Sequence, residues 1–476
     1  MTGMGGQTAP GESVIVLGGG LAGLSAGYVL TQAGRGVKLF EGDSTVGGLS
    51  KTVVKGGFRF DLGGHRFFTK DERIDKFVRD LMEGELISVS RTSKIYMRRK
   101  FFDYPLKPLN AIFGLGVPTT LRILGDYGSE KVIGLTKKTE PVSLEDWVVR
   151  NFGRTMFNVY FKDYSEKVWG IECSNISAEW VAQRIKGLSL AKAVKNAFFK
   201  FSGKDIPTLA DRFLYPEQGI GRLSDRLQEE IEKRNEVFTD TRVVGINHAD
   251  GRIESVAVKN HMCDAEVGGR AFLSSLPLTS LVRMLHPAPP REVLEAASRL
   301  RFRDLVVVAV MVDRERVTDQ TWIYIQEREI PFGRIHEPTN WSRKMAPEGK
   351  TLVVMEFFSF EDDGIWSLDD ERLVDITVEN LEKLGFIGKH EVLDSAVVRV
   401  PKAYPLFDVG YRKHCEVIAG YLERFSNLHV AGRGGMFRYY NMDHAIESGI
   451  NTAERMIGSE ADPGLETSPE MALSGR

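Results

Sequence analysis

The sequence predicts an α/β fold with two sheets and a helical unit, and three observations lead to this prediction. A buried strand, a glycine-rich turn, a helix and a second strand follow one another between residues 13 and 40. Helical periodicity runs through residues 143–200 without a convincing strand. Short β-like runs return after residue 242 and continue to residue 430. Strand-rich and helical blocks therefore interleave, which indicates a nucleotide-binding α/β domain assembled from several chain segments.

The length and charge of the chain exclude several classes of protein. Its 476 residues exceed the usual size of one domain, so we expect two or three domains. Lys and Arg number 63 and Asp and Glu number 65, so the net charge of −2 offers no general attraction for nucleic acid. Cys173, Cys263 and Cys415 lie far apart and match no metal spacing. We therefore expect a cytoplasmic protein with reduced thiols, no metal and no stable membrane insertion.

The elements are predicted in chain order from two periodicities. Short apolar or alternating runs between turn residues predict strands at Ser13–Leu17, Val37–Phe40, Val243–Asn247, Ile253–Val258, Ala271–Leu276, 304–312, 321–326, 351–358, 393–400 and Leu428–Val430. Apolar residues spaced three and four apart predict helices at Leu21–Gln32, 70–83, 143–200, Leu223–Lys233 and Met442–Ile457. The runs between residues 304 and 400 are numerous enough to form a second sheet.

The glycine-rich turn after the first strand carries a dinucleotide-binding pattern. Gly18, Gly20 and Gly23 form G-x-G-x-x-G where the strand meets the helix. The first glycine allows the tight turn, the second admits a pyrophosphate to the backbone, and the third lets the helix pack on the strand. Glu41 ends the second strand, where a carboxylate accepts hydrogen bonds from ribose hydroxyls. Strand, helix, strand and terminal acid in register predict a bound dinucleotide.

Further glycine pairs distinguish between dinucleotides. "EGDSTVGGLSKT" and "FDLGGHRFFT" follow the second strand, and "HVAGRGG" precedes "NMDHAIESGINTAERMI" near the end of the chain. Together these stretches resemble the FAD family that includes amine oxidases, protoporphyrinogen oxidase and UDP-galactopyranose mutase. The resemblance implies non-covalent FAD in a Rossmann-type (GR2-like) FAD-binding domain, with a helical insertion and a second, substrate-side β-sheet domain. It implies cofactor contacts by Gly18, Gly20, Leu21, Ala22, Gly23, Glu41, Gly47, Gly48, Leu49, Gly64, His65, Val243, Gly432, Arg433, Asn441, Met442 and Asp443.

The same resemblance implies how the chain divides into domains. Residues 1–110, 205–275 and 415–476 are expected to form the FAD-binding domain. Residues 111–204 are expected to form a helical substrate domain, and residues 276–414 a sheet-containing substrate domain.

Three stretches resemble the mutase branch of this family. Gly64 and His65 match its GGH motif beside the flavin, and "YFKDYSEKVWG" resembles the segment whose Trp, here Trp169, lines the sugar site. "GRGGMFRYYNMD" resembles its diphosphate-binding run, with Phe437 where the family usually carries a Tyr. The site residues that the resemblance implies are His65, Arg433, Arg184, Tyr439, Tyr440, Trp169 and Arg334, with Arg438 as a second diphosphate clamp.

The resemblance implies a mutase that interconverts pyranose and furanose forms of a sugar nucleotide. In that branch reduced flavin attacks the anomeric carbon through N5, the diphosphate leaves, and the opened sugar recloses through another hydroxyl without net redox change. NADPH or NADH is the expected reductant, and a nucleotide sugar is the expected partner. The sequence leaves open whether the chain forms a homo-oligomer. The alternative is an FAD oxidase or dehydrogenase of the protoporphyrinogen-oxidase or amine-oxidase type, because "YPEQGIGRL" is shared with those branches. A third hypothesis is a flavin-bound protein that catalyses no reaction.

Overall fold

The computed structural model describes residues 12–104, 116–136, 140–184 and 212–461. A parallel five-stranded sheet forms the first layer, in the order β20-β13-β1-β2-β9. Its strands are β1 (Val14–Leu17), β2 (Val37–Phe40), β9 (Glu236–Phe238), β13 (Ala271–Ser274) and β20 (Leu428–Val430). The predicted Rossmann-type α/β domain is thus confirmed, and it is built from both ends of the chain together with the stretch from 236 to 274.

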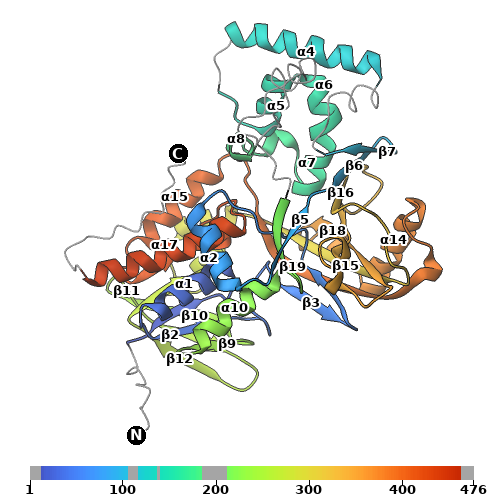
Figure 1. Cartoon of the computed structure of the whole chain (residues 1–476). Coiled ribbons are helices and arrows are strands. Elements are labelled where there is room, and N and C mark those ends of the chain that lie inside the picture. Colours follow the sequence, from blue (N-terminus) through green and yellow to red (C-terminus); the bar gives the residue numbers. More distant parts are fainter. Residues whose placement is uncertain (1–11, 105–115, 137–139, 185–211, 462–476) are drawn as a thin grey trace.

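The two faces of β1 contact different layers. Val14 and Val16 pack with the helices, whereas Ile15 and Leu17 pack with a second, smaller sheet. The helices are α1 (Leu21–Gln32), α2 (Glu72–Met82), α10 (Gly221–Glu232) and α17 (Met442–Ala461), which lie together in Figure 1. The smaller sheet has the order β12-β11-β10-β14 and consists of β10 (Arg242–Ala249), β11 (Arg252–Lys259), β12 (Asp264–Gly268) and β14 (Leu285–His286). Because β1 is covered on both sides, its run of apolar residues is continuous rather than alternating.

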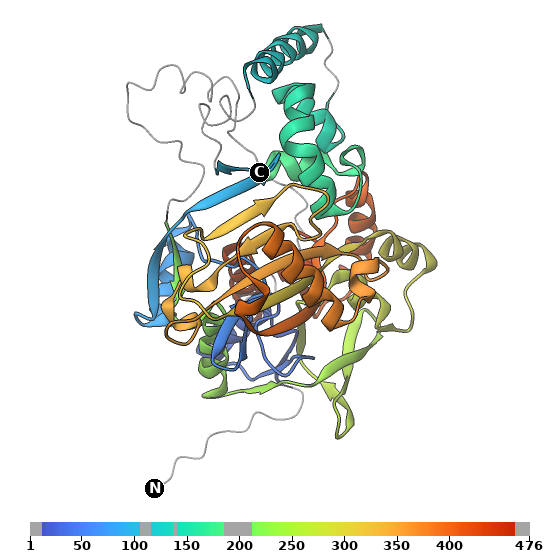
Figure 2. The same cartoon turned by 90° about the vertical axis from the view of Figure 1, so that its right-hand side faces the viewer.

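The third sheet has seven strands in the order β19-β15-β18-β17-β16-β6-β7. They are β6 (Ser93–Met97), β7 (Lys100–Asp103), β15 (Phe302–Val312), β16 (Trp322–Ile325), β17 (Arg334–His336), β18 (Thr351–Ser359) and β19 (Val392–Pro405). Helix α14 (Asp370–Lys383) packs with one face, and the hairpin of β3 (Thr52–Lys55) and β4 (Phe58–Asp61) packs with the other. Figure 2 shows this sheet below the helical unit. It is the predicted second sheet.

The helical unit lies above the two main sheets in Figure 1. It contains α4 (Val117–Thr136), α5 (Leu144–Phe152), α6 (Arg154–Met156), the π-helix η1 (Phe157–Phe161), α7 (Lys162–Trp169) and α8 (Ala178–Arg184). Ser143 and Asp146 form a capping box that starts α5. Asp126 of α4 accepts hydrogen bonds from the backbone and hydroxyl of Thr155, which ties α4 to α6. The helical prediction is confirmed as far as residue 184, and residues 185–200 lie outside the described part.

Shorter elements connect the units. They are β5 (Leu86–Ser90) paired with β8 (Arg212–Pro216), helices α11 (Leu278–Arg283), α12 (Arg291–Arg299), α13 (Gly364–Ser367), α15 (Tyr411–Leu422) and α16 (Gly432–Gly435), and 3₁₀ turns η2 (Cys173–Asn175), η3 (Pro338–Asn340), η4 (Arg343–Met345) and η5 (Lys389–Glu391).

Sheet membership departs from the predicted domain boundaries in two places. Strands β6 and β7 fall within residues 1–110 but complete the seven-stranded sheet, because β6 pairs in parallel with β16. Strand β14 and helix α11 fall within residues 276–414, yet β14 pairs with β10 of the small sheet. In both places a strand pairs with a strand from another predicted domain. Local periodicity does not reveal such pairings.

Candidate functional site

The glycine turn between β1 and α1 is closed by backbone contacts that exclude side chains. Gly18 has a φ of +100°, a conformation that residues with a Cβ rarely adopt. A Cβ on Gly23 would lie 2.0 Å from the Gly18 carbonyl oxygen. Gly20 has no neighbouring atom within 4 Å of such a Cβ position, so its backbone borders open space at the start of α1. The three glycines therefore have the distinct roles that the sequence predicts: turn, open approach and close packing.

Glu41 and a second glycine pair complete this turn. The Glu41 carboxylate accepts the Gly19 N–H at 2.7 Å and the Asp43 N–H at 3.0 Å, which holds the acid against the glycine loop. Gly47 forms a parallel bridge with Gly20 and donates its N–H to the Gly19 carbonyl at 2.7 Å. A Cβ on Gly48 would lie 3.3 Å from Gly20 Cα, and Leu49 follows. The two glycine segments thus form one cradle, and a pyrophosphate fits at its open side against the N-terminus of α1.

The C-terminal segment packs against the same cradle. Gly432, with a φ of +83°, donates its N–H to Ser448 of α17 at 3.0 Å, and a Cβ there would lie 2.8 Å from Ala22 Cβ. A Cβ on Gly449 would lie 2.2 Å from the Ala22 carbonyl oxygen, so α17 crosses α1 at close range. Leu21 and Ala22 are buried at this crossing, next to the glycine turn.

Four further residues predicted to contact FAD lie on or beside elements that adjoin this cradle. Val243 is the second residue of β10, two residues after Thr241, whose N–H donates to the Glu41 carbonyl at 2.8 Å. Asn441 precedes α17, Met442 is buried at its first turn, and Asp443 follows. The glycine turn, the second glycine pair, Glu41 and the Gly432 segment therefore form one glycine-lined cradle whose shape suits a dinucleotide.

Arginine and tyrosine side chains from three elements and the loop before α17 meet beside this cradle. The Arg433 guanidinium, on α16, lies 4.5 Å from the ring centre of Tyr404 and 5.1 Å from that of Tyr439. Arg334, on β17, donates to the Tyr404 hydroxyl at 3.2 Å. Tyr404 of β19 therefore lies between the two arginines. Cations stacked on aromatic rings remain able to present N–H donors to an anion.

Arg334 is also paired with a buried carboxylate. Its Nη2 lies 3.0 Å from Oε2 of Glu356, which is opposite it on β18 and only 1% exposed. Glu356 Oε1 accepts the Gly64 N–H at 3.2 Å. His336 Nδ1 lies 3.9 Å from the same oxygen. Burial raises the pKa of the Glu356 carboxyl, while Arg334 and the Gly64 N–H act in the opposite direction. Arg334 stays protonated at any ordinary pH, and its charge 3.0 Å away favours the ionised form of the Glu356 carboxyl, so the two side chains form an ion pair.

His65 is held neutral in this environment. Burial, together with the positive charges of three arginines, lowers its pKa to about 3. These arginines are Arg433, Arg334 and Arg66. At neutral pH the three guanidiniums are thus charged beside a neutral imidazole, with Glu356 as a buried counter-charge. This balance favours an anionic ligand.

His336 provides a pH-dependent prediction. Burial and the Arg334 charge lower its pKa to about 3 in the folded state, whereas an unfolded histidine titrates near 6.5. The unfolded state therefore binds the extra proton, and this contribution to stability is present above pH 6.5 and lost as pH falls toward 3. Between pH 7 and pH 5, His336 should lower the free energy of unfolding by about 2 kcal/mol.

Denaturant unfolding of His336→Gln measures this contribution. The variant should lose about that part of the pH dependence between pH 7 and pH 5. The exposed His261→Gln substitution should leave the dependence as it is in the wild type. An unchanged slope in His336→Gln would contradict the assignment.

The structure separates some residues that the sequence grouped together. Tyr439 contacts Arg433, but the Tyr440 ring stacks on His444 at 5.9 Å and its hydroxyl faces Met436 Sδ at 3.8 Å. The two tyrosines that were predicted to act together therefore contact different residues. The buried ring of Phe437 lies 5.2 Å from Phe302 in the core.

Two further predicted site residues, Arg438 and Trp169, have neighbours outside the glycine cradle. Burial raises the pKa of the Cys415 thiol on α15 to about 12, and the Arg438 charge acts in the opposite direction. Trp169 is 4% exposed and packs edge-on against Trp180 at 4.9 Å and Tyr404 at 6.5 Å. Its ring thus contacts the tyrosine that lies between the two arginines. Arg184 ends α8, and its side chain lies outside the described part.

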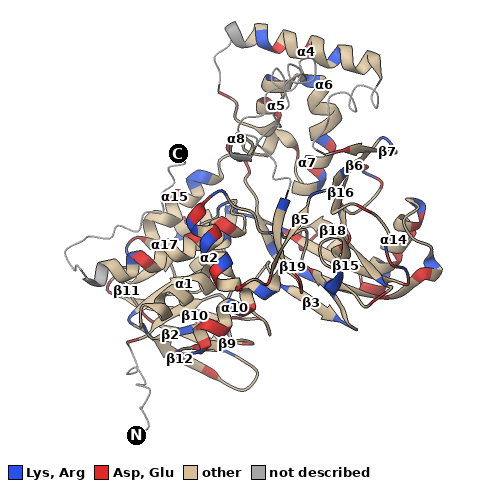
Figure 3. Cartoon of the chain, in the orientation of Figure 1, with Lys and Arg blue, Asp and Glu red and all other residues tan. Residues whose placement is uncertain are grey.

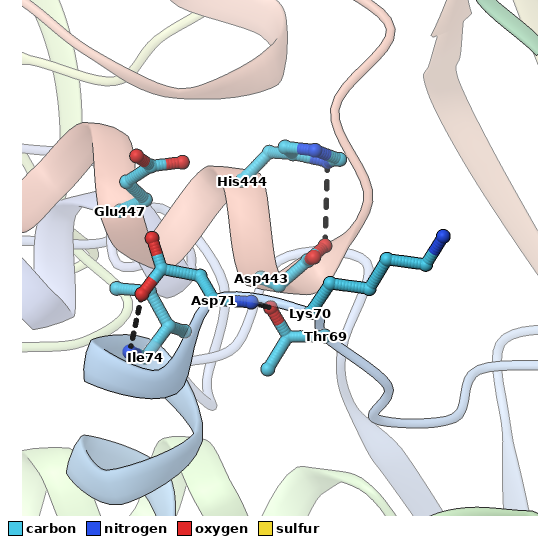
Figure 4. Close-up of a pocket in the computed structure, with 7 residues that line it drawn as sticks. All are labelled: Thr69, Lys70, Asp71, Ile74, Asp443, His444 and Glu447. Atoms are coloured by element: carbon cyan, nitrogen blue, oxygen red, sulfur yellow. Dashed lines mark hydrogen bonds and ion pairs between the residues drawn. The ribbon is translucent and has the colours of Figure 1, made fainter.

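A cavity of about 340 Å³ opens between the starts of α2 and α17 (Figure 4). Asp443 lines it together with Lys70, Asp71 and Glu447. The Asp443 carboxylate lies 3.3 Å from His444 Nδ1, and a dashed line marks this contact in Figure 4. Its lining mixes both signs of charge, unlike the arginine-rich cluster near His65. Among the predicted site residues, only Asp443 lines this cavity.

Two residues at the site were missed by sequence reasoning. Glu356 interrupts the apolar run "LVVMEFFSF", and a charge within a buried strand signals a buried partner. Tyr404 lies in "AYPLFDVGY" and was not predicted as a site residue. Both lie on the seven-stranded sheet, and their contacts come from elements far away in sequence.

Other features of the described residues give no further site. None of the helices described has the length and hydropathy needed to cross a bilayer. The described residues hold no group of three His, Cys, Asp or Glu side chains arranged for a metal ion. Figure 3 shows blue Lys and Arg interspersed with red Asp and Glu across all three units.

Comparisons with known proteins agree with this architecture. The model of the family described as flavin containing amine oxidoreductase matches residues 21–457. Coproporphyrinogen III oxidase of Bacillus subtilis is 21% identical over 84% of this chain and 89% of its own length. Protoporphyrinogen oxidase 2 of Arabidopsis thaliana is 20% identical over 95% of both chains. The structure of reduced UDP-galactopyranose mutase superposes with a TM-score of 0.80 at 22% identity, covering 94% of this chain and 96% of that one.

Proposed function

This chain belongs to the flavin-containing amine oxidoreductase family, and on that premise we propose that it is an FAD-dependent mutase acting on a sugar nucleotide. It would interconvert pyranose and furanose forms. The observation that carries the proposal is the pairing of Arg334 and Arg433 around Tyr404, beside a neutral His65. A nucleoside diphosphate carries the charge and the acceptor oxygens that two guanidiniums bind.

The cradle residues would hold FAD without a covalent bond. The backbone of the Gly18–Gly23 turn and the N-terminus of α1 would bind the pyrophosphate, and Glu41 would accept hydrogen bonds from the ribose. The N-terminus of α17, at Met442, would favour negative charge on a nearby ring. When bound and reduced, FAD supplies an electron-rich nitrogen and stores two electrons. NADPH or NADH is the proposed reductant.

The chain's own residues would bind and orient the substrate rather than exchange protons with it. Arg334 and Arg433 would hold the diphosphate while its bond to the sugar breaks and re-forms, which is positioning and charge stabilisation. Tyr404 and Tyr439 would direct the guanidiniums by stacking. His65, neutral in this environment, would offer an uncharged ring beside the reacting centre.

A binding experiment tests the proposal before any turnover is measured. UDP titrated into the FAD-loaded protein should bind, and Arg334→Ala should weaken that binding about tenfold or more because a charged donor is lost. Rising salt should weaken it further. Absence of binding by any nucleoside diphosphate would count against the mutase.

The second candidate is an FAD oxidase that releases an oxidised product. The observation that favours it is that both porphyrinogen oxidases above match most of the chain. Porphyrinogens carry carboxylates, which the same arginines could bind. Oxygen consumption with such a substrate, without UDP binding, would support the oxidase.

A further inference from the structure

Glu356 connects two parts of the site that the sequence places far apart. Its carboxylate is almost fully buried on β18, the strand beside Arg334. Oε2 lies 3.0 Å from the Arg334 guanidinium, and Oε1 accepts the Gly64 N–H at 3.2 Å. Gly64 and Glu356 are 292 residues apart in the sequence. One side chain thus contacts both the arginine and the loop that carries His65.

The loop is shaped to lie over this carboxylate. Gly63 has a φ of +121°, and a Cβ on it would lie 3.2 Å from Glu356 Oε2. His65 donates its N–H back to the Gly63 carbonyl at 2.7 Å, which forms a tight turn. A larger residue at Gly63 would push the loop away from the carboxylate. Glycine at position 63 therefore allows the loop to lie close to Glu356.

The Arg334 guanidinium already contacts two groups of the protein. Its Nη2 contacts both Glu356 and the Tyr404 hydroxyl. Its Nε is buried without a hydrogen-bond partner among the described residues. An anion arriving at Arg334 would compete with the buried carboxylate for the same guanidinium and be repelled by its charge.

We infer that Glu356 is a positioning residue that couples anion binding at Arg334 to the Gly63–His65 loop. When an anion draws Arg334 away, the carboxylate shifts and the Gly64 hydrogen bond shifts with it. The loop predicted to lie beside the flavin therefore responds to occupancy of the anion site. This inference rests on the proposed function only in taking a diphosphate as the anion.

Glu356→Gln separates coupling from simple support of the fold. Glutamine retains the side-chain volume and one oxygen that can accept the Gly64 N–H, but it removes the negative charge. In the FAD-loaded oxidised protein, inorganic diphosphate should bind about threefold to tenfold more tightly, because a like charge near the anion is gone. The change in flavin absorbance on binding should fall to less than about half of the wild-type change. A merely structural role would predict weaker binding instead.

Matched variants complete the test. Glu337→Gln changes another fully buried carboxylate, which accepts from the backbone of Val317 and Thr318 rather than from an arginine. It should lower thermal stability and leave both diphosphate affinity and the absorbance response unchanged. Glu356→Asp retains the charge on a shorter side chain, so it should bind diphosphate as the wild type does while losing the absorbance response.

The outcomes separate this inference from the proposed function. Wild-type affinity and absorbance response in Glu356→Gln would overturn the coupling while leaving the mutase intact. If Glu356→Gln does not fold, a full response in Glu356→Asp would overturn it equally. Diphosphate binding without any sugar-nucleotide turnover would contradict the mutase while leaving the coupling in place.

Discussion

Arg433→Ala should retain FAD and lose turnover by about a hundredfold to a thousandfold. The guanidinium lies between the rings of Tyr404 and Tyr439, where it can present donors to a leaving diphosphate. The glycine cradle that would hold FAD does not depend on this side chain. Flavin content and turnover of the purified variant therefore provide the two measurements.

Two further variants make this result interpretable. Arg433→Lys retains the charge but lacks the planar, two-donor geometry, so it should recover only part of the activity. Arg424→Ala removes another arginine stacked on a tyrosine, at 5.5 Å from the Tyr421 ring on α15, and should leave turnover unchanged. Full turnover in Arg433→Ala would show that this residue does not bind the diphosphate.

Gly23→Ala should yield a protein that binds no FAD. The added Cβ would lie 2.0 Å from the Gly18 carbonyl oxygen, and that atom belongs to backbone rather than to a flexible side chain. The turn cannot shift easily, since Gly18 donates its N–H to Phe40 at 2.8 Å and Gly449 packs tightly on Ala22. We expect a destabilisation of about 3 kcal/mol and loss of the visible flavin absorbance.

A second helical glycine is the control for this substitution. Gly420 lies within α15, and a Cβ there meets no atom within 4 Å. Gly420→Ala should retain FAD and raise stability by about 0.5–1 kcal/mol, because alanine favours a helix. Wild-type flavin content in Gly23→Ala would contradict the assigned role of the turn.

Local chemistry explains which elements the sequence predicts well. Helix α1 and strands β2 and β20 occur at the predicted bounds, because a glycine turn or a short apolar run defines each of them within a few residues. The β3–β4 hairpin and strand β17 were not predicted. Strand β17 is only three residues long, Arg334–His336, and its pairing partners lie on β16 and β18. Such short strands depend on their neighbours rather than on their own pattern.

The residues of the candidate site also fall into those that local sequence predicts and those that depend on distant contacts. The glycines, Glu41 and Arg433 belong to motifs that are continuous in sequence, so pattern alone predicts them. Glu356 and Tyr404 contribute through contacts between strands and loops separated by long stretches of chain. Those contacts depend on the order of the seven-stranded sheet, which periodicity does not encode. The lone acid in an apolar strand was the one available signal.

The most direct test of the mutase is to ask whether reduced protein isomerises a sugar nucleotide without oxidising it. Dithionite-reduced, FAD-loaded protein is incubated without oxygen with a panel of nucleotide hexoses, and the products are separated and weighed by mass spectrometry. We expect a product of unchanged mass and altered retention, formed by reduced protein only. An oxidised product that forms together with oxygen consumption, and no isomer from any nucleotide sugar, would contradict it.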